Sequence, residues 1–161
     1  MDIASIVGML GIATLNLIAM ETPVIFWNIP SALIVLGGTI MLILFSFPLQ
    51  NVGSFGRYCW YAFVPPKANN DVEKVRRDLE MGILILNRAK TFFLVTGLVG
   101  TMIGAILMLK EMSDLSAVAP AIAVAILTTF YGIIMAYFFC LPIKTKLQVH
   151  LKNLDKDAWI E

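Results

Sequence analysis

Three threonine hydroxyls are the side chains best placed to do chemistry in this sequence. Thr101 lies in a long uncharged stretch at residues 91–109, and Thr128 and Thr129 lie in a second one at residues 118–141. Hydroxyl oxygens at these positions could coordinate a hard cation as it passes, or hydrogen-bond to a chain of water molecules. A threonine in a helix also bonds readily to the carbonyl of the preceding turn, so its burial proves little. The residues leave two interpretations open, a polar path or close packing.

Small residues accompany these hydroxyls at helical spacing on both stretches. Small side chains repeated every four residues let two membrane helices approach closely. We expect this face to pack against a partner helix. The small residues concerned are Gly97, Gly100 and Gly104 on the first stretch and Ala121, Ala125 and Gly132 on the second.

No Asp, Glu, Lys or Arg occurs inside any long apolar stretch of the chain. Ion pathways through membranes are normally built around an intramembrane ionisable group, which binds and releases the ion. Two hypotheses follow. Either the chain conducts no ions, or a second polypeptide supplies the carboxylate.

The composition places the chain in a membrane. Of its 161 residues, 59% are hydrophobic and 14% are charged, and the mean hydropathy is +0.84. A helix crosses the roughly 30 Å hydrocarbon core with about 20 residues. The first apolar stretch lacks the basic start of a signal peptide, so we expect it to be retained. The predicted fold is an all-α polytopic membrane protein with four transmembrane helices, at residues 3–20, 29–47, 91–109 and 118–141.

The basic residues indicate the orientation of these helices. Lys and Arg gather between residues 48 and 90 and after residue 141, whereas the other two connections are poor in them. Because cytoplasmic flanks collect basic residues, both termini are predicted to be cytoplasmic. The net charge of +1 gives no support to a nucleic-acid partner. The predicted organisation is helices 1 and 2 in residues 1–47, a cytoplasmic segment in 48–90, helices 3 and 4 in 91–141, and a cytoplasmic tail in 142–161.

The cytoplasmic segment contains two further predicted features. Aromatic residues surround Arg57 in residues 57–63, which is typical of a segment at the headgroup level. After residues 69–71, which could cap a helix, apolar residues recur at helical spacing from about Val72 and predict a helix that continues into the third span. Its charged pairs predict a solvated face or a docking surface for a cytoplasmic partner. These pairs are Glu73/Arg77, Lys74/Asp78 and Arg76/Glu80.

The remaining reactive residues form no recognisable catalytic site. Cys59 and Cys140 lack metal-ligand spacing and are predicted to be unpaired thiols in a reducing compartment. His150, in the charged tail, is predicted to be a solvated surface residue. We expect no enzyme activity on small molecules, no bound metal and no cofactor.

Six sequence motifs follow one another along the chain. They are DIASIVG at residues 2–8, IPSALIVLGGT at 29–39, FSFP at 45–48, GLVGTMIG at 97–104, PAIAVAILTTFYG at 120–132 and LPI at 141–143. In these motifs and their order, the chain resembles the MotA/PomA flagellar stator family, within the wider MotA/TolQ/ExbB group. The motifs cover all four predicted spans, and four spans favour the MotA branch over TolQ or ExbB.

This resemblance implies a subunit of an ion-driven rotary motor in the bacterial inner membrane. The family forms a homopentamer around two copies of a MotB-like protein, whose single span carries the ion-binding Asp. Flow of H⁺ or Na⁺ then rotates the pentamer and powers the flagellum. Thr101 matches the family's hydroxyl in span 3 and resembles the sodium-driven type, and Thr129 matches the second threonine of span 4. Pro142 matches the cytoplasmic-end proline, and we expect it and Pro120 to serve structure or coupling.

Two departures from the family pattern keep other functions open. The segment at residues 48–90 is much shorter than the family's usual cytoplasmic domain, where the rotor-contacting charges lie, and Leu94 stands where a proline usually opens span 3. The alternatives are a non-flagellar energiser of the TolQ/ExbB type, a structural membrane scaffold without ion flow, and a small-molecule transporter. Broken helices and inverted repeats would favour the transporter, and the sequence shows neither.

Overall fold

The computed structural model describes residues 26–64, 72–110, 112–113 and 115–157, together with the isolated positions 7, 8, 11, 14 and 18. All elements in this part of the chain are helical, which confirms the all-α prediction there. Apart from the isolated positions, the predicted first span and the predicted helix cap at residues 69–71 lie outside the described residues. The elements are α2 (Ile29–Ala32), η2 (Leu33–Gly37), α3 (Gly38–Ser46), α4 (Leu49–Gly53), α5 (Phe55–Phe63), α6 (Val72–Lys110), α7 (Leu115–Ile134), η3 (Met135–Cys140) and α8 (Leu141–Asp157).

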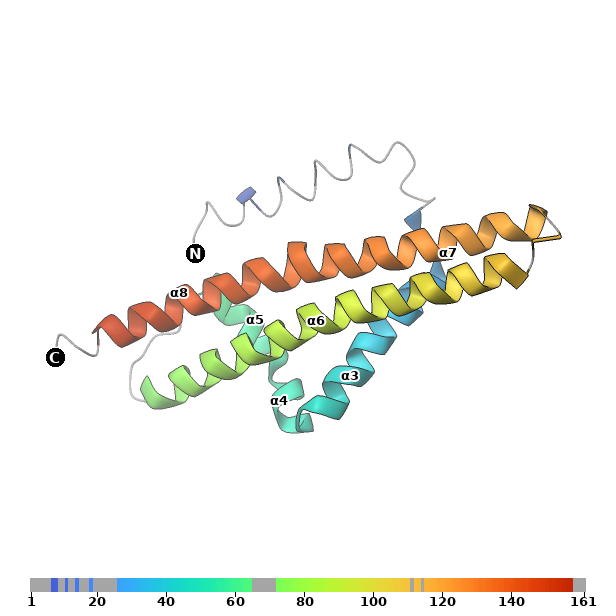
Figure 1. Ribbon diagram of the computed structural model, residues 1–161. Coiled ribbons are helices and arrows are strands. Elements are labelled where there is room, and N and C mark those ends of the chain that lie inside the picture. Colours follow the sequence, from blue (N-terminus) through green and yellow to red (C-terminus); the bar gives the residue numbers. More distant parts are fainter. Residues whose placement is uncertain are drawn as a thin grey trace.

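Two long antiparallel rods dominate the structure (Figure 1). One is α6, a single helix of 39 residues that is about 58 Å long at 1.5 Å per residue. The other is the continuous run of α7, η3 and α8. The prediction that a helix starting near Val72 continues unbroken into the third span is confirmed.

Three helical segments of the described chain are long and apolar enough to cross a membrane, at Ile29–Ser46, Val72–Lys110 and Val118–Lys156. Within α6, the uncharged run between Lys90 and Lys110 rises about 30 Å, which matches the thickness of a hydrocarbon core. Thr101 lies near the middle of this run, so the candidate hydroxyls belong to the centre of the membrane.

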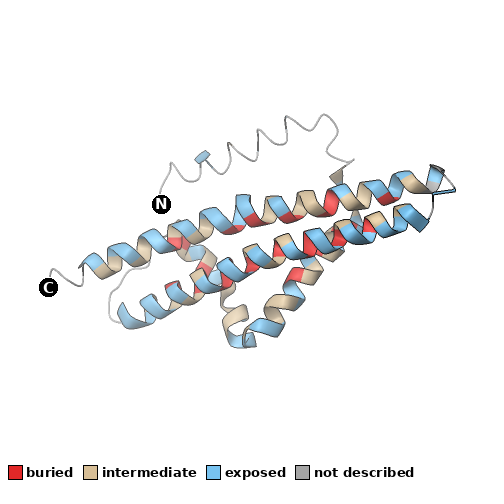
Figure 2. Cartoon of the chain, in the orientation of Figure 1, coloured by how far each residue is buried: buried red, intermediate tan, exposed pale blue. Residues whose placement is uncertain are grey.

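The buried residues line the contact between the two rods, while the outward faces are exposed (Figure 2). The core joins Leu79 and Leu86 of α6 to Leu147 of α8, and it includes Val35 of η2 and Ala62 of α5. The outer faces carry large exposed apolar side chains. Apolar surface of this extent suits lipid or further protein chains. Examples are Leu98, Met102, Ile106, Ile126 and Ile133.

The helix geometry changes just before Pro142. A proline inside a helix has no N–H, and its ring clashes with the carbonyl four residues earlier. The π-helical segment η3 ends two residues before this proline. A wider turn of this kind accommodates the disturbed hydrogen bonds without breaking the rod. Pro120 lies near the start of α7 and is exposed, and the coupling roles of both prolines remain predictions.

Tyr131 of α7 fixes the entrance to the second span. Its hydroxyl donates to the carbonyl of Phe26 and accepts from the backbone N–H of Asn28 at 3.2 Å. The Asn28 side chain in turn caps α2 by accepting from the backbone N–H of Ser31 at 3.0 Å. Such an N-cap satisfies a helix donor that would otherwise lack a partner.

Helix α5 packs against the extensions of α6 and α8 beyond the apolar run. A Cβ atom on Gly82 would lie 2.9 Å from Tyr58 Cβ and 3.0 Å from Leu147 Cδ1, so the three elements meet closely there. Arg57 forms a salt bridge with Asp78 at 3.3 Å. The predicted position of this segment at the headgroup level remains a prediction.

The charged pairs at the far end of α6 differ partly from expectation. The Arg76–Glu80 pair is confirmed at 3.2 Å. Arg76 also reaches Asp155 of α8 at 3.6 Å, which ties the ends of the rods together. Among the described residues, Asp78 pairs with Arg57 of α5 instead of its predicted partner, because α5 folds back against α6. The predicted pairs Glu73/Arg77 and Lys74/Asp78 do not form in this part of the chain.

Candidate ion site between α6 and α7

The hydroxyls of Thr101 on α6 and Thr129 on α7 meet at the interface between the two helices. Their Oγ1 atoms form a short hydrogen bond. Thr101 Oγ1 also lies 3.0 Å from the carbonyl oxygen of Gly97 in its own helix and 3.0 Å from that of Ala125 across the interface. A hydroxyl has one proton and two acceptor sites, so these contacts can exchange. The structure thus brings together two hydroxyls that the sequence placed among small residues at helical spacing, one on each helix.

Thr128 extends this group of oxygens and is fully buried. Its Oγ1 lies 2.9 Å from the carbonyl of Val124, 3.1 Å from that of Ala125 and 3.5 Å from Thr101 Oγ1. The Ala125 carbonyl is therefore shared by two hydroxyls. Neutral oxygens of this type are the ligands that hard cations prefer.

The two helices meet this closely because glycines leave no side chain between them. A Cβ on Gly97 would lie 2.9 Å from the Thr128 carbonyl oxygen, and one on Gly104 would lie 2.6 Å from the Ala125 backbone nitrogen. On α7, a Cβ on Gly132 would lie 2.6 Å from the Phe93 carbonyl oxygen. Backbone contact of this kind is what small residues permit in membrane helices.

The predicted small-residue face therefore lies mainly within the chain itself. Gly97, Gly100, Gly104 and Gly132 are buried at the α6–α7 contact. The Thr128 side chain fills the space beside Gly100, where a Cβ would come within 2.6 Å of its methyl carbon. Contact of these residues, or of Ala121 and Ala125, with a second chain remains a prediction. The surface left for a second chain consists of the exposed side chains beside the α6–α7 contact, which we call the hydroxyl seam.

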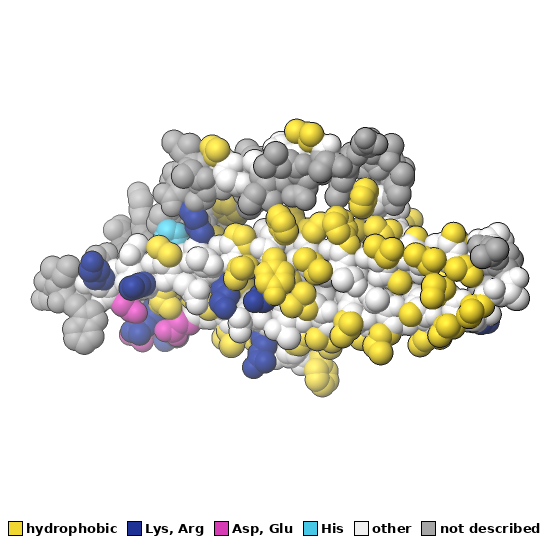
Figure 3. All heavy atoms as spheres, turned by 45° about the horizontal axis from the view of Figure 1, so that its top comes forward, with side chains coloured by type: hydrophobic (Ala, Val, Ile, Leu, Met, Phe, Trp, Pro, Cys, Tyr) yellow, Lys and Arg dark blue, Asp and Glu magenta, His cyan; other side chains and the backbone are white. Residues whose placement is uncertain are grey.

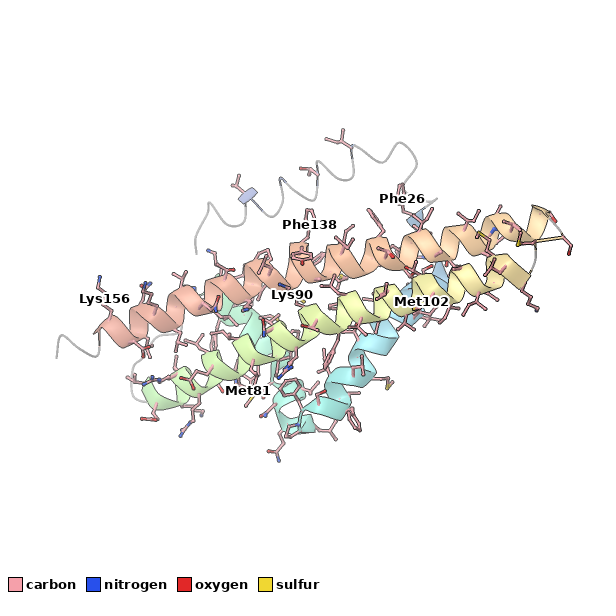
Figure 4. The ribbon with its side chains drawn as sticks, in the orientation of Figure 1. Phe26, Met81, Lys90, Met102, Phe138 and Lys156 are labelled. Atoms are coloured by element: carbon pink, nitrogen blue, oxygen red, sulfur yellow. The ribbon has the colours of Figure 1, made fainter. Side chains whose placement is uncertain are left out.

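Charge is confined to the ends of the membrane-length helices. At one end lies Lys90, which is labelled in Figure 4. Its Nζ is 5.0 Å from the centre of the Tyr137 ring, a favourable cation–π distance. Between Lys90 and Lys110, and from residue 118 to Ile143, the chain has no charged side chain. A cation bound at the hydroxyl group would thus lack a counter-charge from these two stretches of α6 and α7 to α8.

A second buried hydroxyl pair was not predicted from the sequence. Thr39 of α3 and Thr96 of α6 lie with their Oγ1 atoms 3.1 Å apart, and both are buried. Thr96 also lies 2.9 Å from its own Phe92 carbonyl. If the Thr96 hydroxyl donates its proton to the Phe92 carbonyl, its oxygen accepts a hydrogen bond from the Thr39 hydroxyl. The only sequence signal for this pair was the glycine next to each threonine. Gly38 packs on Thr96, since a Cβ added to Gly38 would lie 3.0 Å from the methyl carbon of Thr96.

This pair gives a test of what holds the second span against α6. We expect Thr96→Val to destabilise the protein by about 1–3 kcal/mol, because it strands the buried Thr39 hydroxyl without its acceptor. Thr39→Val should cost less, since Thr96 keeps its bond to Phe92. The double variant should be more stable than Thr96→Val alone. Thermal unfolding of the detergent-solubilised protein measures this order, and simple additivity of the two single losses would contradict the assignment.

Fold and site together define a polytopic helical membrane protein with a hydroxyl-lined seam, and sequence comparison identifies its family. The model of the MotA/TolQ/ExbB proton channel family matches residues 65–158. The chain belongs to this family, which is a family of channels and not of enzymes.

Individual relatives place the similarity in the motility branch. Motility protein A of Aquifex aeolicus is 26% identical over 224 residues, which cover the whole of this chain and 88% of that protein. Chemotaxis protein PomA of Vibrio alginolyticus is 45% identical over 53 residues, or 33% of this chain and 21% of PomA. The higher identity of the PomA match is thus confined to a short segment.

Two solved structures share the fold. The flagellar MotAB stator complex of Bacillus subtilis contains a chain that matches 95% of this one, with a TM-score of 0.77 and 16% identity. C. jejuni MotAB gives a TM-score of 0.77 and 18% identity over 96% of this chain. The match covers 83% and 84% of the respective chains.

Proposed function

We propose that this protein is the MotA-like subunit of an ion-driven stator, in which the hydroxyls of Thr101 and Thr129 form part of the ion path. The observation that carries the proposal is their hydrogen bond at mid-membrane, in a helix pair without charged side chains. Thr128 positions the pair through the shared Ala125 carbonyl. Membership of a proton channel family supports ion flow as the purpose of this seam.

The missing counter-charge implies a second polypeptide. Ion pathways through membranes are normally built around an ionisable group, and the described spans have none in their apolar runs. We infer that a MotB-like single-span protein supplies an Asp against the α6–α7 hairpin. The likeness to chains of two MotAB complexes supports this partner. In the arrangement that the resemblance implies, five copies of this subunit surround two copies of the partner.

We propose that the translocated ion is H⁺ or Na⁺ and that its flow drives flagellar rotation. The subunit would lie in the inner membrane with both termini in the cytoplasm. A non-flagellar energiser is the second candidate, and a specific observation favours it. The match to the Aquifex protein extends over 224 residues, although this chain has 161. The relative therefore has residues without counterparts in this chain. A subunit that lacks them could drive a protein other than the flagellar rotor.

The decisive experiment is the stoichiometry of the purified assembly. The protein would be co-expressed with a candidate single-span partner of the MotB type, extracted in mild detergent and weighed by native mass spectrometry. A ring of five enclosing two foreign helices is the expected result. The matched control replaces the partner's span Asp with Asn, which should abolish ion flux into vesicles and leave the assembly intact. A ring without foreign helices would instead support the scaffold.

A further inference from the structure

The charges along the two rods fall into two zones. Next to the apolar run lies a group of basic residues, which we call the basic collar. Residues 81–110 and 141–154 contain no Asp or Glu, so no carboxylate on either rod accompanies the collar. Farther out, Glu73, Asp78, Glu80 and Asp155 mix with basic residues at the tip. The basic collar consists of Arg88 and Lys90 of α6 and Lys144 and Lys146 of α8.

The collar residues from both rods lie at one level. Lys144 Nζ donates to Asn87 Oδ1 at 2.7 Å, which fixes the register of α8 against α6. Asn87 precedes Lys90 by three residues, a rise of about 4.5 Å. A headgroup layer is roughly 5–8 Å thick on each side of the hydrocarbon core. With the apolar run spanning the core, the collar falls within the headgroup layer.

The collar differs from the tip in what its cations contact. Lys90 lies over the Tyr137 ring, and Lys144 contacts an amide oxygen, so neither partner carries a negative charge. At the tip, Arg76 contacts two carboxylates. Figure 3 shows dark-blue side chains alone beside the yellow apolar surface, and magenta among them only farther out. The collar is therefore a site of net positive charge facing the membrane surface.

A groove of about 610 Å³ between α6 and α8 opens at the collar. The groove begins at the collar, where Asn87, Lys144 and Gln148 line it, and ends at the tip, where Glu80, Lys152 and Asp155 line it. Between the two ends the lining is apolar, with Ile83, Leu84 and Leu151. The ammonium group offers charge to a phosphate, and the amides offer donors and acceptors to headgroup hydroxyls. The collar end of the groove therefore suits a phosphate headgroup, whereas the carboxylates at its tip end would repel one.

We propose that the basic collar and the adjoining groove bind an anionic phospholipid of the cytoplasmic leaflet. The phosphate contacts Lys144, and Asn87 and Gln148 contact the rest of the headgroup. Arg88 and Lys90 add positive charge next to the apolar run. Juxtamembrane basic clusters are attracted to anionic lipid in this way. The site is separate from the hydroxyl seam, and the proposal does not depend on ion transport.

The test is lipid binding to the intact detergent-solubilised assembly, followed by native mass spectrometry with phosphatidylglycerol and, separately, with phosphatidylcholine. The wild-type protein should retain phosphatidylglycerol at least about tenfold more tightly than phosphatidylcholine. The triple variant Arg88→Gln, Lys90→Gln, Lys144→Gln should lose this preference, because each basic residue contributes a several-fold share of the attraction. Inorganic phosphate added at millimolar concentration should not displace the lipid.

A matched variant removes the same charge at the tip, with Lys74→Gln, Arg77→Gln and Lys156→Gln. It should keep the lipid preference of the wild type. Equal loss in both triple variants would overturn the site, since net charge alone would then explain binding. Displacement by free phosphate would overturn the lipid assignment. A collar variant with unchanged lipid binding and an altered number of subunits would show that the collar is a contact between copies of the chain.

Discussion

Gly132→Ala is expected to separate α6 from α7 and to destabilise the protein by about 1–3 kcal/mol or more. The new Cβ would lie 2.6 Å from the Phe93 carbonyl oxygen and 3.2 Å from Gly97 Cα. Both are backbone atoms, so neither can turn aside as a flexible side chain would. The helices must move apart, and the Thr101–Thr129 bond is lost with them. Thermal unfolding in detergent and size-exclusion chromatography measure the loss of stability and assembly.

Gly37→Ala is the matched control for this effect. Gly37 also lies in a membrane-length helix, but a Cβ there meets nothing within 4 Å. Alanine has the higher helix propensity, so the substitution should be neutral or slightly stabilising. If both variants unfolded at the same temperature, close packing at Gly132 would not be what holds the hairpin together.

Replacing Thr101 or Thr129 with Ala is expected to reduce ion-dependent function roughly five- to tenfold, or to change its sodium dependence, while the assembly stays intact. A reduction of this size corresponds to the loss of about one hydrogen bond at the ion. Each variant also leaves the helix contact in place, because it shortens a side chain at the seam. Ion flux into vesicles holding the subunit and its partner, measured across a range of sodium concentrations, gives the readout.

Thr101→Ser keeps the hydroxyl and removes only a methyl group, so it should retain most of the flux and its ion preference. Thr39→Ala removes a buried hydroxyl on the other side of α6 and should lower stability without changing the ion dependence. Unaltered flux in both Thr101→Ala and Thr129→Ala would remove these hydroxyls from the ion path. Loss of assembly in them would assign the pair to packing.

The sequence predicted the features that depend on local pattern. Hydrophobic length placed the later spans, and helical periodicity from Val72 predicted the extension of α6. The helical spacing of the small residues placed Thr101 and Thr129 on the small-residue faces of two helices. In the structure their hydroxyls form a hydrogen bond. Each of these follows from properties of a single helix, namely its period, its length and the distribution of its charges.

What the sequence could not predict depends on which helix faces which. Thr39 and Thr96 are far apart in the chain, and a buried threonine looks the same whether it bonds to its own helix or to another. The glycine stripe indicated close packing but not that α7 of the same chain would fill it. The salt bridge from Arg57 to Asp78 requires α5 to fold back, which no local pattern encodes.

The two rods differ in helix geometry, since one arm is α-helical throughout and the other contains a π-helical segment. From Thr101 to the start of α6 at Val72 the helix is unbroken, and this distance is about 43 Å. A tilt of about 10° about the membrane centre would therefore displace its far end by roughly 7 Å. The second arm contains the π-helical segment η3 at the membrane boundary, and Arg76–Asp155 links the arms at their ends. We expect a tilt of α6 to be accommodated in the second rod at η3, because the regular α-helical hydrogen bonding is interrupted there. A small motion at mid-membrane would then become a larger sideways displacement outside it.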